Sequence, residues 1–131
     1  MKLNVTKVVD PGSPRDERIV LKASQETDLG AYVLFRARLA GHGVSNKLEE
    51  TFWFPDRKLN KDDLVVVYTS KGAETKSQSK DGTTSYFFHW NLDSPIWKEE
   101  DAVPLLMRVE AWDYLDIHPK DIIIKSPSRT E

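Results

Sequence analysis

The chain has no cysteine among its 131 residues. Without thiols it has no disulfide framework, no cysteine-ligated zinc site and no thiol nucleophile. No stretch approaches the roughly 20 consecutive apolar residues that a membrane helix needs, and the first residues carry no apolar secretion signal. We therefore expect a chain without a membrane span that is cytoplasmic, or extracellular if it is excised from a longer protein.

The chain also lacks a strong charge of either sign, since its formal net charge is −2. A strongly basic balance is the usual mark of nucleic-acid binding, and it is absent. The distribution is less even, because residues 57–80 carry a net charge of +3 and residues 93–121 a net charge of −5. Either these segments are solvated loops, or they form two faces of opposite potential. The candidate polyanion contacts are Arg57, Lys58, Lys61, Lys71, Lys76 and Lys80.

Motifs of common catalytic sites are missing as well. The sequence has no serine in a nucleophile elbow and no glycine-rich phosphate loop. Asp116, His118 and Asp121 have a loose metal-ligand spacing, but Pro119 interrupts any helix that would align them. We expect no enzymatic activity, no metal and no cofactor.

Short runs rich in β-branched and aromatic residues, separated by turn residues, dominate the chain. The expected strands span residues 3–9, 17–23, 29–39, 51–54, 64–69, 84–90 and 103–112, with a last apolar run at 117–125. Residues 64–69 are nearly all apolar and predict a central strand, whereas the polar residues 70–83 predict a mobile loop. At most one helical turn is expected, after Ser94. The pattern favours one all-β domain over residues 1–125, an antiparallel two-sheet sandwich, followed by a frayed tail at 126–131.

Residues 84–97 hold six large apolar side chains around a Ser-Pro turn. Because side chains alternate along a strand, Phe88 and Trp90 share one face, which we assign to the core, and Phe87 lies on the other face. After the turn, Trp97 is expected to close the end of the sandwich. We predict that Trp90 and Trp97 form a structural plug. The alternative is a platform on which sugars stack.

Several motifs occur in an order that resembles the lamin-tail domain, an immunoglobulin-like β-sandwich. The matching segments are Val8 to Gly12, Glu17 to Lys22, Asp28 to Leu34, Phe54 to Asp56 with Leu59, Asp62 to Thr69, Trp90-Asn91, Trp97 to Asp101 and Val103 to Met107. The chain departs from the family at Tyr32, where a tryptophan is usual, and at Asp63, where a turn glycine is common. It also lacks the family's hairpin near residues 108–111.

The resemblance implies a non-catalytic interaction module, since family members bind protein and nucleic-acid partners and have no catalytic residues. We therefore expect a protein-binding module. A carbohydrate-binding module is the alternative, and it would need exposed rings among Trp53, Trp90, Trp97 and Trp112. Weak nucleic-acid binding through residues 57–80 ranks third.

Any binding of polyanions through the six basic residues of 57–80 should be electrostatic. We expect it to be weak and to collapse between about 50 and 200 mM salt, because it would depend on counterion release. A filter-binding titration with duplex DNA at several salt concentrations measures this. Sequence-selective binding that survives the higher salt would contradict the expectation.

Overall fold

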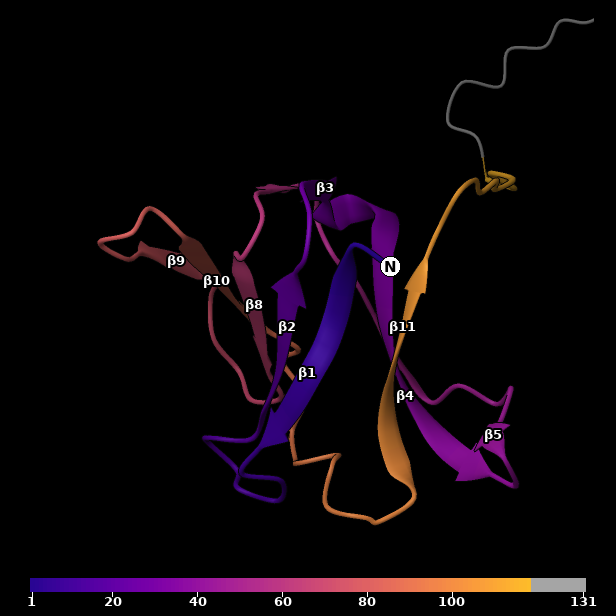
Figure 1. The fold of residues 1–131 in the computed structure, drawn as a ribbon. Helices are drawn as coiled ribbons and strands as arrows, with labels where there is room; N and C mark the ends of the chain where they lie inside the picture. Colours follow the sequence, from indigo (N-terminus) through magenta and orange to yellow (C-terminus); the bar gives the residue numbers. More distant parts are fainter. Residues whose placement is uncertain (119–131) are drawn as a thin grey trace, which may run out of the picture.

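The computed structural model describes residues 1–118 and shows an all-β chain (Figure 1). Within this part the only helical element is the short 3-10 helix η1 (Leu29–Ala31). The strands form two larger sheets and one two-stranded sheet, in a β-sandwich-like arrangement. The expected end of the domain at residue 125, the tail at 126–131 and most of the last apolar run lie outside the described residues.

The larger sheet has the strand order β1-β2-β8-β10-β9. Its strands are β1 (Leu3–Val9), β2 (Arg18–Ala23), β8 (Leu64–Tyr68), β10 (Thr84–His89) and β9 (Thr75–Gln78). The apolar strand β8 lies between β2 and β10, which confirms its predicted central position. A strand whose two faces are both covered needs such an apolar run.

The prediction of an antiparallel sandwich is wrong for this sheet, because β10 runs parallel to β8. The expected loop at residues 70–83 instead contains the edge strand β9, which forms an antiparallel hairpin with β10. Because β10 runs parallel to β8, the chain has to return to the end of the sheet where β8 starts before it enters β10. A parallel pair needs a connection of a dozen or more residues, and this segment supplies it.

The second sheet has the strand order β11-β4-β5, and β6 also pairs with β4. Its strands are β4 (Tyr32–Ala40), β5 (Gly43–Val44), β6 (Glu50–Trp53) and β11 (Ala102–Arg108). The two-stranded sheet joins β3 (Thr27–Asp28) to β7 (Lys58–Leu59). Two sequence predictions are corrected here. Residues 29–31 form η1 instead of starting a strand, and the strand expected at 103–112 ends at Arg108.

Both larger sheets contribute to one core. The five-stranded sheet provides Ile19, Leu21, Val65, Val67 and Phe88, and the second sheet and its neighbours provide Tyr32, Leu34, Phe54 and Leu59.

Phe52 contacts three aromatic rings edge-on, those of Phe54, Phe88 and Trp90. Phe88 and Trp90 are buried and Phe87 is half-buried, as the alternation of residues 84–90 predicts.

One buried carboxylate, that of Glu17, joins three parts of the chain that are distant in sequence. Its Oε1 accepts hydrogen bonds from the backbone N–H groups of Gly12 (2.8 Å) and Trp97 (3.1 Å). Its Oε2 accepts from the Thr69 hydroxyl (2.5 Å) and the Ile96 N–H (2.9 Å). Only 1% of Glu17 is exposed, so these four donors replace the water that the carboxylate leaves.

The Glu17 end of the sandwich, defined by Glu17, Ile96 and Trp97, is therefore closed. Trp97 is buried and packs near Trp90, with ring centroids 6.2 Å apart. Arg36 donates to the Ile96 carbonyl (2.7 Å) and also forms ion pairs with Glu49 and Glu99. The Glu99 carboxyl has a lowered pKa because it accepts from Arg38 and Arg36. No helix forms after Ser94.

Trp97→Ala should lower the free energy of unfolding by about 3–5 kcal/mol, the usual effect of deleting a buried large aromatic side chain. The indole N–H of Trp97 has no hydrogen-bond partner within residues 1–118, so the ring acts through packing. Urea unfolding followed by circular dichroism measures the change, with Trp112→Ala as the matched control at an exposed site. An unchanged stability together with lost oligosaccharide binding would show a sugar platform instead.

Glu17→Gln keeps the shape of the side chain but replaces one acceptor oxygen by an NH₂ donor. The Thr69 hydroxyl can turn to accept from that group, whereas the Ile96 N–H cannot. We expect a loss of about 1–3 kcal/mol in unfolding free energy, the penalty of one buried unsatisfied donor. Glu26→Gln, at an exposed carboxylate, should change stability by less than about 0.5 kcal/mol. Equal effects of the two substitutions would refute the role given to Glu17.

Candidate binding surface

Three exposed aromatic side chains lie together where the second sheet ends near η1. They are Trp53, Trp112 and Tyr114, which are 46%, 65% and 74% exposed. Scattered exposed apolar residues are normal, but clustered ones mark binding sites. We call these three residues the aromatic surface, and the end of the sandwich that carries them the Gly30 end.

Trp53 is held in place by strand pairing and by one hydrogen bond. It is the last residue of β6 and pairs with Val33 on β4. Its indole Nε1 donates to the carbonyl of Gly30 in η1 at 2.9 Å. A side chain at residue 30 would displace the Asp56 side chain, because a Cβ there would lie 1.8 Å from Oδ1 of Asp56 and 3.0 Å from its Cα. The indole therefore has a defined orientation although it is partly exposed.

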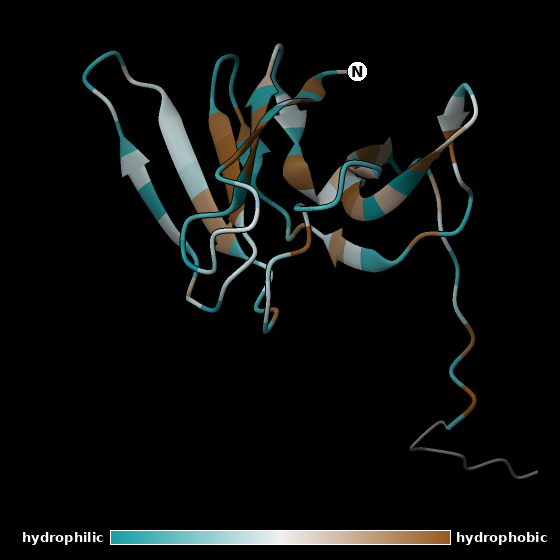
Figure 2. Ribbon diagram, turned by 90° about the horizontal axis from the view of Figure 1, so that it is seen from below, coloured by the Kyte–Doolittle hydropathy of each residue, from teal (hydrophilic) through white to brown (hydrophobic). Residues whose placement is uncertain are grey.

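Trp112 and Tyr114 follow β11 in an extended segment. The N–H of Val109 donates to the carbonyl of Ala31 (2.7 Å), which ties the start of this segment to η1. Trp112 meets Trp53 edge-on, with centroids 5.2 Å apart and planes at 86°. Tyr114 stacks on Trp112 at 6.2 Å and 28°. Residues 111–118 are all exposed, and the segment runs away from the sheets (Figure 2).

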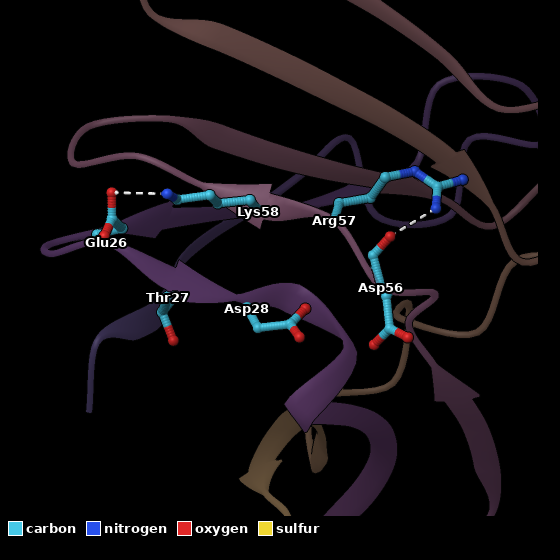
Figure 3. A pocket seen from close by; sticks show the side chains of 6 residues that line it. All are labelled: Glu26, Thr27, Asp28, Asp56, Arg57 and Lys58. Carbon is cyan, nitrogen blue, oxygen red and sulfur yellow. Dashed lines mark hydrogen bonds and ion pairs between the residues drawn. The ribbon is translucent and has the colours of Figure 1, made fainter.

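A hollow of about 440 Å³ lies at the same Gly30 end, between β3 and the segment that leads into β7. Its lining residues are Glu26, Thr27, Asp28, Asp56, Arg57 and Lys58 (Figure 3). Asp28 caps η1, since its Oδ1 accepts from the Gly30 N–H at 3.0 Å. Gly30 thus contacts the carboxylates of Asp28 and Asp56, and its carbonyl binds Trp53.

Both cations of the hollow are bound by carboxylates. Lys58 pairs with Glu26 at 3.4 Å. Arg57 binds Glu74 through two hydrogen bonds of 2.9 and 2.7 Å, and this contact raises the pKa of the guanidinium. The hollow therefore offers the Asp28 and Asp56 carboxylates to a ligand. Within residues 1–118 no group of three metal-ligating side chains occurs, and the Asp121 of the loose metal trio lies beyond them.

The sequence-predicted polyanion contacts are only partly available. Besides Arg57 and Lys58, Lys71 is paired, with Asp93 at 2.9 Å, and it lowers the pKa of that carboxyl. Lys61, Lys76 and Lys80 have no ion pair in the described part of the chain. They lie in the turn before β8, on strand β9 and in the β9–β10 turn.

Of the four tryptophans, the structure buries Trp90 and Trp97 and exposes Trp53 and Trp112. Sequence reasoning missed Tyr114 and placed Trp112 in a strand. A signal was available in the sequence, since three acidic residues are interspersed among the large apolar ones from Glu110 to Ile117. A core strand rarely accepts so many carboxylates, so this pattern indicates an exposed segment.

The chain matches no protein-family model, no curated protein and no solved structure. The lamin-tail resemblance therefore rests on the motifs of the sequence alone. Across residues 1–118, no helix is long and apolar enough to cross a membrane.

Proposed function

We propose that the chain is a non-catalytic interaction module that binds protein partners through the aromatic surface. The observation that carries the proposal is the cluster of Trp53, Trp112 and Tyr114 at the Gly30 end. Tryptophan and tyrosine contribute most to binding energy at protein interfaces. Trp53 is fixed by its hydrogen bond to Gly30, so less side-chain entropy is lost on binding.

We also propose that the fold is immunoglobulin-like and of the lamin-tail type. The order of the motifs and the two larger sheets around one core support this assignment. Tyr32 is buried where the family has a tryptophan, so an aromatic core residue is kept, and its hydroxyl lies 3.1 Å from that of Thr27. At Asp63, where the family commonly has a turn glycine, the side chain is buried and accepts from the Asn60 and Thr84 N–H groups, and the positive φ of 74° falls on the preceding Asp62.

A carbohydrate-binding module remains the second candidate, because Trp53 and Trp112 are exposed. A sugar platform needs flat ring faces that point to solvent in nearly one plane. Trp53 and Trp112 are perpendicular, and Tyr114 covers one face of Trp112. The N–H of Trp53 is already bound to Gly30 and is not free for a sugar hydroxyl. The geometry favours a protein partner over a sugar.

A peptide-display selection on the purified protein tests the proposal. Selected peptides are titrated by fluorescence anisotropy against the wild type, Trp112→Ala and Leu39→Ala, the last being an exposed apolar residue on β4. We expect Trp112→Ala to weaken binding about 30-fold, the effect of losing an interface hot spot of about 2 kcal/mol. Leu39→Ala should bind like the wild type, and neither substitution should lower Tm appreciably.

A glycan array is probed with the same three proteins. Binding of an oligosaccharide that Trp112→Ala abolishes would replace the protein partner by a sugar. Peptides that bind Trp112→Ala as tightly as the wild type would show that the aromatic surface is not the binding site.

A further inference from the structure

The Gly30 end combines the aromatic surface with two carboxylates, those of Asp28 and Asp56, that form no ion pair within residues 1–118. The Asp56 carboxylate has no hydrogen bond or ion pair with residues 1–118. Arg57 lies next to it in the chain, but Glu74 binds that guanidinium through two hydrogen bonds. Asp28 uses one oxygen for the Gly30 N–H. Both carboxylates line the hollow, and both contact the glycine whose carbonyl holds Trp53.

The extended segment after β11 adds charge of the same sign. Asp113 accepts only from the N–H of Tyr114, and Asp116 only from that of His118, within the described residues. Glu110 is paired with Arg108. The segment that carries Trp112 and Tyr114 therefore also carries carboxylates without an ion pair in the described residues, and such charges attract cations.

Arginine is the side chain whose chemistry fits both parts of this surface. Its planar guanidinium stacks on aromatic faces and donates two hydrogen bonds to one carboxylate, and it is more weakly hydrated than the ammonium of lysine. The hollow, at about 440 Å³, is large enough for such a side chain. The aromatic surface is linked to the hollow through Gly30, whose N–H binds Asp28 and whose carbonyl binds Trp53, and its exposed rings do not enclose a small ligand, which favours a longer chain as the occupant.

We propose that the partner is an extended, arginine-bearing peptide segment. One guanidinium enters the hollow and donates to Asp28 and Asp56, while the adjoining peptide lies on Trp53 and Trp112 with a second arginine against the exposed rings. This assignment rests on the proposed function, since it names the class of partner for the same surface. Charge complementarity selects the arginines, and the aromatic side chains supply the apolar contact.

The test uses fluorescein-labelled peptides in which serine alternates with arginine, lysine, citrulline or glutamate. Citrulline keeps the shape of arginine and removes its charge. The full chain is titrated with each peptide by fluorescence anisotropy, as wild type, Asp56→Asn, Trp112→Ala and Asp16→Asn. Asp16 is the control, because it is an exposed aspartate in the turn before β2, next in sequence to Glu17 at the opposite end.

We expect the arginine peptide to bind more tightly than the lysine peptide, and the citrulline and glutamate peptides to bind at least about tenfold more weakly. Asp56→Asn and Trp112→Ala should each weaken arginine-peptide binding by about the same factor, and Asp16→Asn should not. Equal binding of the arginine and citrulline peptides, no binding of the arginine peptide, or indifference to Asp56→Asn would overturn the assignment.

The display selection separates this failure from failure of the proposed function. If selected peptides need Trp112 but are not enriched in arginine, the module still binds protein and the arginine assignment is wrong. If no peptide depends on Trp112, the protein-binding surface itself is wrong.

Discussion

The hydrogen bonds of the buried Glu17 carboxylate hold together the segments that close one end of the sandwich. The carboxylate is buried without a cation within the described residues and is held by four donors from Gly12, Thr69, Ile96 and Trp97. A buried carboxylate left without such donors would be strongly destabilising, so the turn before β2, the end of β8 and the segment around Trp97 have to be in place together. One side chain thereby couples three distant segments of the chain.

The two ends of the sandwich place their aromatic residues differently. Trp97 and Ile96 cover the core there, and Arg36 holds the Ile96 carbonyl, so the aromatic residues of this end serve packing. At the Gly30 end the chain turns through η1, where Gly30 lies close against Asp56. The same glycine orients Trp53 and places two carboxylates beside it. The closed end and the proposed binding surface therefore lie at opposite ends of the strands (Figure 1).

Much of the fold could be predicted from local patterns. The bounds of β1 are those that alternation and the following proline-glycine turn indicate, and the apolar run of β8 marks a central strand. Strand β9 could not be predicted, because its four residues are polar and exposed and are ordered only by pairing with β10. Strand β9 carries the chain back, so that β10 runs parallel to β8. This direction could not be predicted either, because it depends on the same unpredicted strand.

Composition and local spacing are enough to assign the class of protein, an all-β chain without thiols. Local spacing suffices for this, because alternation and turn residues act over a few positions. The tertiary structure was needed to show that Trp53 and Trp112 are exposed side by side and that Arg57, Lys58 and Lys71 are already paired. Those outcomes depend on contacts between residues far apart in the chain, such as Trp53 with Gly30 and Trp112, or Arg57 with Glu74.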